Sequence, residues 1–148
     1  EMFPEVALPS NVSVRHVGYL PSERDVIRLF DRERLHACYL GLWHEQHRAL
    51  FARTSLSQKL VTYAAAGVPV LADVPEASAG WRLLRQYGGG VRVDGAESIA
   101  EAISPLFFNR STWRSMSEGV RRLCLEQFNI RENATRLGDL LTRSATPN

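Results

Sequence analysis

Residues 55–72 read SLSQKLVTYAAAGVPVLA, and they predict a helix that runs directly into a buried strand. Ser55 and Gln58 have the spacing of a capping box, in which each side chain satisfies an amide at the helix start. Gly67 suits the left-handed residue that ends a helix, and Pro69 keeps the helix from resuming. The stretch therefore predicts both ends of one helix.

The predicted helix has two different faces. Its buried stripe falls at helical spacing and consists of Leu56, Leu60, Tyr63 and Ala64. Lys59 and Thr62 are three residues apart, so they lie together on the other face near the helix start. Free amides and the macrodipole favour an anion at a helix start, so a phosphate would explain a lysine in this place. A solvated lysine on an ordinary amphipathic helix is the equally weighted alternative.

The pattern K-L-x-x-Y-x-A-A-G-x-P-V runs through the same stretch, and its residues are Lys59, Leu60, Tyr63, Ala65, Ala66, Gly67, Pro69 and Val70. It resembles the donor-binding motif of GT-B glycosyltransferases, and more closely that of the branch that builds bacterial exopolysaccharides and lipopolysaccharides. In that family the helix start holds the diphosphate of a nucleotide-sugar, and two glutamates complete the signature. Their positions are Thr54 and Thr62 in this chain. The resemblance extends more weakly over residues 11–141.

The resemblance implies a donor-binding site around the helix start. First-turn amides and Lys59 would hold the diphosphate, and Thr62 would bind the ribose in place of the family's glutamate. The turn at residues 18–20 would clamp the nucleobase through backbone groups, and a plain turn into a helix is the alternative. Glu45 would contact the sugar, or else stand as a solvated carboxylate. The implied donor-binding set is Tyr19, Leu20, Ser55, Leu56, Ser57, Gln58, Lys59 and Thr62.

The composition is that of an ordinary globular domain. The chain has 148 residues, of which 45% are hydrophobic and 23% are charged, and this suits one domain with a sizeable core. Its net charge of +2 does not favour nucleic acid as a partner. Cys38 and Cys124 lie in apolar patterns and are expected to be buried thiols, as in a reducing cytosol. Because no membrane-length apolar run and no signal peptide is present, we expect a cytoplasmic protein.

Two groups of polar residues have competing explanations. His44 and His47 are three residues apart, but no third ligand is near, so we expect no metal site and no cofactor. Six arginines on three predicted helices would suit a peripheral contact with anionic lipid at the inner face of a membrane, or else ordinary scattered surface charge. They are Arg82, Arg85, Arg110, Arg114, Arg121 and Arg122.

Hydrophobic patterns predict alternating strands and helices along the chain. The strands are expected at residues 11–17, 37–43, 68–72 and 91–94. Further helices are expected to begin at Ser22, Ser78, Asp94, Ser111 and Asn129, and Pro105 should kink or shorten one of them. This alternation indicates an α/β fold with a Rossmann-like parallel sheet flanked by helices, whose ligands bind beyond the carboxyl ends of the strands.

The resemblance implies that residues 1–148 form most of the C-terminal, donor-binding half of a GT-B enzyme. The first strands of that half and the N-terminal acceptor domain would be absent, so two strands encoded upstream would separate residues 11–17 from residues 37–43. We therefore expect a glycosyltransferase domain that is inactive by itself and uses a nucleotide-sugar and a glycan or lipid-linked acceptor. An epimerase of the same fold, which needs no acceptor, and a non-catalytic module that binds a nucleotide or a protein are the alternatives.

Overall fold

The computed structural model describes residues 13–41 and 49–144, and its centre is a small parallel sheet. The strands are β1 (Cys38–Gly41), β2 (Val70–Asp73) and β3 (Gly90–Arg92), paired in the order β1-β2-β3. Cys38 lies opposite Val70, which in turn lies opposite Gly90. An α/β fold with a parallel sheet flanked by helices is thus confirmed, and three of the four predicted strands lie close to their expected positions.

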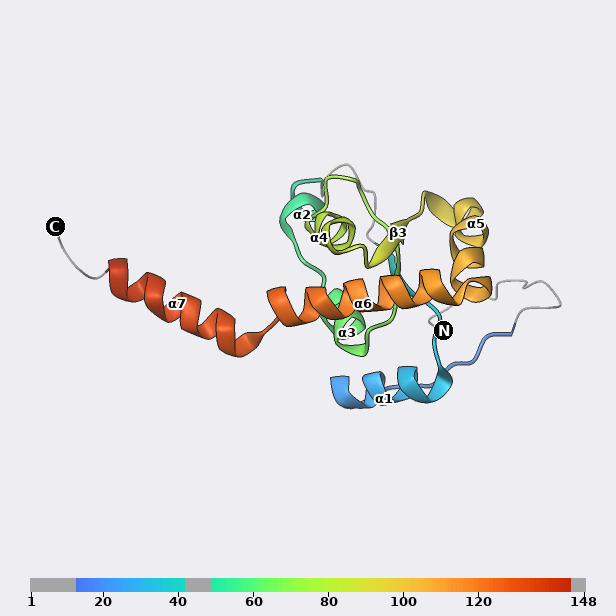
Figure 1. The fold of residues 1–148 in the computed structure, drawn as a ribbon, viewed down its shortest axis with the longest axis horizontal. Coiled ribbons are helices and arrows are strands. Elements are labelled where there is room, and N and C mark those ends of the chain that lie inside the picture. The colour runs from blue at the N-terminus through green and yellow to red at the C-terminus, as the bar shows by residue number, and fades with distance from the viewer. Residues whose placement is uncertain (1–12, 42–48, 145–148) are drawn as a thin grey trace.

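The described helices surround this sheet. They are α1 (Glu23–Glu33), α2 (Ala49–Thr54), α3 (Gln58–Ala66), α4 (Ala79–Tyr87), α5 (Gly95–Phe108), α6 (Arg110–Gln127) and α7 (Ile130–Ser144). The long helix α6 crosses the body and packs against α3, α4 and α5, while α1 packs against α3 (Figure 1). Helix α3 is therefore held between α1, α6 and the edge strand β1.

Two apolar clusters cover the two faces of the sheet. Because side chains alternate along β2, Val70 and Ala72 face one cluster and Leu71 faces the other. The first cluster joins α3, α4 and α6 to the sheet and contains Leu40, Leu60, Val70, Ala72, Val74, Leu84, Tyr87 and Leu123. The second joins α5 and the first half of α6 to the sheet and is built on Leu71, Val93 and Leu106. Both clusters meet at β2, so this central strand fixes the positions of the helices on either side.

Several helix ends agree with their predictions. The hydroxyl groups of Ser22 and Ser78 each accept the amide of the third helical residue at 3.2 Å, and they cap α1 and α4. Gly67 and Gly88 adopt left-handed conformations, with φ of 68° and 66°, and they end α3 and α4. The turn from each of these helices into the following strand therefore has the expected geometry.

Two other helices differ from the predictions. Helix α6 begins one residue before Ser111, because the Asn109 side chain caps it by accepting the amides of Ser111 and Thr112, both at 3.1 Å. Pro105 lies inside α5, which continues to Phe108, so the proline does not shorten the helix. The amide of Asn109 donates to the Pro105 carbonyl at 3.0 Å and keeps the last turn of α5 closed.

The predicted strand at residues 11–17 is wrong over its described part, because residues 13–20 form no regular secondary structure. Val14 and Val17 are 73% and 46% exposed. Alternating valines form a stable strand only beside a paired neighbour, and no described strand pairs with them. Instead, an ion pair of 2.8 Å between Arg15 and Glu33 joins this segment to the end of α1.

Helix α7 lies outside the body of the molecule (Figure 1), and the side chains described from Ile130 to Thr142 are all exposed. Its predicted start is confirmed, since the Asn129 side chain accepts the amides of Arg131 and Glu132 at 3.2 and 3.4 Å. The helix therefore continues the chain beyond α6 without adding to either core cluster.

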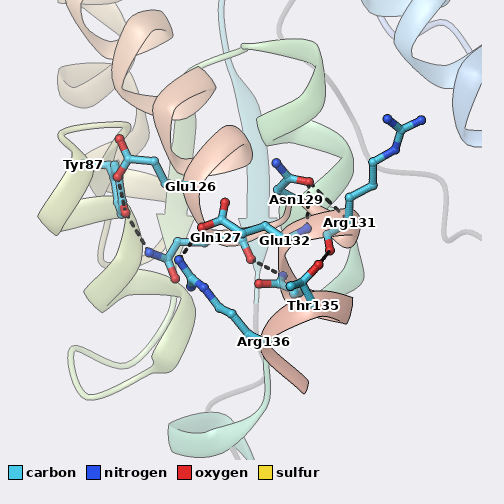
Figure 2. A network of polar contacts seen from close by, with 9 residues as sticks. Tyr87, Glu126, Gln127, Asn129, Arg131, Glu132, Thr135 and Arg136 are labelled. Carbon is cyan, nitrogen blue, oxygen red and sulfur yellow. Dashed lines mark hydrogen bonds and ion pairs between the residues drawn. The ribbon is translucent and has the colours of Figure 1, made fainter. Parts of the chain in front are cut away.

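A polar network joins the first turn of α7 to the body (Figure 2). The Tyr87 hydroxyl, at the end of α4, donates to a Glu126 carboxylate oxygen at 2.9 Å and accepts the Gln127 amide at 2.8 Å. The Asn133 side chain donates to the Gln127 carbonyl at 2.9 Å. These bonds orient the junction between α6 and α7 through polar contacts.

Candidate functional site

Helices α3, α4 and α5 all begin at the carboxyl ends of the strands. Helix α4 follows β2 and α5 follows β3, whereas α3 ends at Gly67 and leads into the amino end of β2. In parallel α/β sheets, ligands bind beyond the carboxyl ends of the strands. The start of α3, which is predicted to bind a diphosphate, thus lies at the carboxyl ends of the strands, where a ligand is expected.

The start of α3 differs in detail from its prediction. The helix begins at Gln58 with Ser57 as its N-cap residue, so the capping box on Ser55 is wrong. The Ser57 side chain makes no capping hydrogen bond, and the Gln58 side chain donates to a Glu23 carboxylate oxygen at 3.4 Å instead of reaching back. Helix α2 continues to Thr54 and leaves three residues before α3, which moves the helix start downstream.

Two backbone amides at the start of α3 have no acceptor among the described residues. The amide of Leu60 donates to the Ser57 carbonyl at 3.0 Å and closes the first turn. The amides of Gln58 and Lys59 precede it, where no carbonyl of the helix can accept them. Together with the positive end of the helix dipole, these amides are suited to an anionic acceptor.

Helical spacing correctly predicts which side of α3 faces the core. Leu60 and Ala64 are fully buried, whereas Lys59 is exposed and Thr62 is half-buried. Leu56 is 40% exposed because it precedes the helix, so its assignment to the buried stripe is wrong. Lys59 is the only lysine in the sequence, and the chain places it in the first turn of this helix.

Only some of the other residues predicted to contact the donor lie near the start of α3. Leu20 stands just before α1, and a contact between Glu23 and Gln58 makes the starts of α1 and α3 neighbours. Tyr19 is 89% exposed, and its side chain makes no hydrogen bond or ring contact with the described residues. Glu45 and the predicted histidine pair lie outside the described residues.

A hydrogen-bonded pair at the carboxyl ends of β1 and β2 was not predicted. The Tyr39 hydroxyl donates to a carboxylate oxygen of Asp73 at 2.6 Å. This bond, with smaller contributions from desolvation and the Asp73 charge, raises the pKa of Tyr39. The Tyr63 hydroxyl of α3 donates to the Tyr39 carbonyl at 3.2 Å, on the side of β1 away from β2. An aspartate directly after a predicted strand was the available sequence signal for this site.

Burial raises the pKa of both cysteine thiols. Cys38 is buried, and burial raises the pKa of its thiol to about 12. Cys124 is half-buried, and desolvation raises its pKa as well. The thiolate is the reactive form, so both residues act as apolar side chains. Among the residues that the structure describes, no three histidine, cysteine, aspartate or glutamate side chains lie close enough to hold a metal ion.

Comparisons of the chain with protein-family models, with curated proteins and with solved structures gave no match. Within residues 13–41 and 49–144, no helix combines the length and the apolar character needed to span a membrane. The function must therefore be inferred from the geometry at the carboxyl edge of the sheet.

Proposed function

We propose that this chain is the donor-binding half of a GT-B glycosyltransferase, which transfers a sugar from a nucleotide-diphosphate sugar to a glycan or lipid-linked acceptor. The observation that carries the proposal is the start of α3, where two uncapped amides and Lys59 meet at the carboxyl edge of a parallel sheet. The motif over residues 59–70 supports the family, and the described α/β arrangement is compatible with it.

The proposed role of this helix start is electrostatic. As the bond between the sugar and the diphosphate breaks, negative charge grows on the leaving diphosphate. Lys59 and the amides of Gln58 and Lys59 would stabilise that charge, because donors that are already in place need no rearrangement during the reaction. The Glu23 carboxylate, 3.4 Å from the Gln58 side-chain nitrogen, acts in the opposite direction. Lys59 must therefore offset a carboxylate as well as the phosphates.

Thr62 would contact the ribose from the next turn of the same helix. Its hydroxyl contributes less than the family's glutamate, because hydrogen bonds to a charged group are the stronger class. Affinity for the nucleotide should therefore depend more on the diphosphate than on the ribose. The acceptor contacts and the catalytic base would come from a second domain, as in the family.

The test of this proposal is the substitution Lys59→Ala. A charge-assisted contact contributes about 1.5–3 kcal/mol, so we expect the variant to bind uridine or guanosine diphosphate roughly ten- to a hundredfold more weakly. Isothermal titration calorimetry measures the change. Arg131→Ala removes the same charge from an exposed position on α7 and should leave the affinity unchanged.

The single lysine also permits a direct measurement. Reductive methylation with ¹³C-formaldehyde keeps the charge of Lys59 and gives one lysine resonance, which should shift when the nucleotide diphosphate binds. The exposed Lys59 side chain does not stabilise the core, so Lys59→Ala should melt at the same temperature as the wild type. A folded Lys59→Ala variant with wild-type affinity, or a lysine resonance that does not move at saturation, would rule out the proposed site.

A further inference from the structure

A cavity of about 530 Å³ opens at the amino ends of the strands, on the edge of the sheet opposite the start of α3. His36 lines it just before β1, and Val68 lines it just before β2. Its walls are the last turns of α1 and α5 and the first half of α6, which lie on the right of the body in Figure 1. The length of α3, about 13 Å, separates this cavity from the proposed donor site.

Planar apolar groups form part of the cavity lining. Phe30, Phe107 and Trp113 contribute aromatic rings to it. The His36 ring stacks on Phe107, with 4.4 Å between the ring centroids and 12° between the ring planes. The Trp113 indole donates to the His36 carbonyl at 3.0 Å, so the segment before β1 is held against α6. The cavity lining is therefore rich in aromatic side chains.

Three arginines line the same cavity, namely Arg34, Arg110 and Arg121, and the lining contains one carboxylate, that of Asp31. None of the three guanidinium groups forms an ion pair with a described carboxylate, whereas Arg15 and Arg32 both pair with Glu33 nearby. The lining side chains thus leave an excess of two positive charges at neutral pH.

Two of the three arginines lie on α6, and both are exposed. Arg110 is the first residue of α6, where the helix dipole is positive and a cation is unfavourable. Arg121 lies directly over Gly67, and a Cβ atom at position 67 would clash with its guanidinium nitrogen. Arg121 is exposed, and the atoms involved are at the far end of its side chain. An anionic ligand would offset the unfavourable dipole at Arg110 and the excess positive charge of the lining.

We propose that this cavity binds a small phosphate monoester that carries an aromatic ring. A phosphate monoester has a charge of about −1.5 to −2 at pH 7, which matches the excess of two positive charges better than a single carboxylate does. The planar fork of arginine suits phosphate oxygens, and the aromatic lining suits the ring. The volume falls in the range of about 300–1,000 Å³ that is usual for small-molecule pockets. The site is independent of the proposed donor site.

Phenyl phosphate is the probe, and the tryptophan indole N–H resonances report where it binds. In a titration of the ¹⁵N-labelled chain, we expect the Trp113 resonance to move and the Trp81 resonance of α4 to stay, since Trp113 lines the cavity. Phenol and inorganic phosphate, which each lack one half of the probe, should bind more weakly. Saturation without movement of the Trp113 resonance would overturn the assignment, as would equal affinity for inorganic phosphate, which needs no ring.

Charge substitutions give the second arm of the test. Arg110→Gln and Arg121→Gln should each weaken phenyl phosphate binding about tenfold or more. Arg114→Gln is the matched control, because it removes the same charge one turn after Arg110 but does not line this cavity. Equal losses in all three variants would show a general charge effect and would refute the site. If Arg121→Gln does not fold, Arg110→Gln is the deciding variant. Arg110 is exposed at the first position of α6, so its substitution should leave the fold intact. A loss in Lys59→Ala alone would place the phosphate at the donor site instead.

Discussion

Helix α3 starts at the carboxyl ends of the strands and finishes at their amino ends. The backbone groups at its two ends differ in their hydrogen bonds. At its end, the amides of Gly67 and Val68 donate to the carbonyls of Ala64 and Tyr63 at 3.0 and 3.3 Å. The Ser117 hydroxyl donates to the Gly67 carbonyl at 2.7 Å. At its start, no side chain caps the first amides. The end is closed by the protein, and the start is open.

Burial accounts for this difference. Gly67, Val68 and Ser117 are buried, so an unsatisfied polar group among them would lose its bonds to water without replacement. Gln58 and Lys59 are exposed, so water or a ligand can accept from their amides. The start of α3 can bind a ligand without disturbing the fold, because no core contact depends on its free amides.

Helix α4 starts at the same end of the strands as α3, and its N-cap residue is also a serine. Ser57 and Ser78 have similar backbone angles, with φ of −67° and −66° and ψ of 128° and 145°. Only Ser78, which is fully buried, caps its helix through the side chain. The difference between an open and a capped start therefore lies in the side chain and its surroundings.

We expect the greatest loss of stability from Leu60→Ala, which removes a core side chain from the first turn of α3. Leu60 is fully buried in the first apolar cluster, so we expect the free energy of unfolding to fall by about 2–5 kcal/mol. Urea denaturation measures this change. Thr62→Ala, about half a turn away and half-buried, should cost much less. Equal costs for the two variants would mean that α3 is rotated from its described position.

Local patterns are sufficient to predict the parallel sheet and the orientation of α3. Apolar spacing correctly predicts that Leu60 is buried and Lys59 is exposed, because it follows directly from the helical period. The same reasoning fails at residues 13–17, where no strand within the described part of the chain pairs with Val14. Strand pairing depends on distant residues, so alternation alone does not establish a strand.

The candidate sites required more than local pattern. Helix α3 begins at Gln58 and not after Ser55, because α2 runs to Thr54 and the next three residues connect the two helices; a capping pattern carries no information about that neighbour. The cavity at the opposite edge brings Arg34 together with Arg110 and Arg121. Arg110 and Arg121 share one face of α6, since eleven residues make about three helical turns, but Arg34 is distant in the chain. Tertiary packing is therefore needed to bring the end of α1 to this face.

A smaller effect separates the two serine positions. Ser78→Ala should cost about 1 kcal/mol, since it removes a side-chain cap from a buried helix start. Ser57→Ala should cost at most a few tenths of a kcal/mol, because no capping bond is lost. Chemical denaturation of both variants measures the difference. A cost for Ser57→Ala as large as that for Ser78→Ala would indicate that the Ser57 side chain caps α3 in solution. The first amides of α3 would then already have an acceptor.

The smallest expected effect concerns the carboxyl ends of β1 and β2, beside the open start of α3. The hydrogen bond from Tyr39 to Asp73 favours the neutral phenol and raises the pKa of Tyr39, to which desolvation adds. Because the pKa is higher in the folded state than in the unfolded state, this stabilisation is complete below about pH 10 and is lost as the pH rises through the raised value. NMR of tyrosine labelled with ¹³C at Cζ follows the titration. Asp73→Asn should lower the pKa of Tyr39 toward its ordinary value, since the negative acceptor is removed. If Tyr39 titrates at the same pH in the wild type and in Asp73→Asn, the hydrogen bond does not persist in solution. The side chains of Tyr39 and Asp73 would then be available to a ligand, as the amides at the start of α3 are.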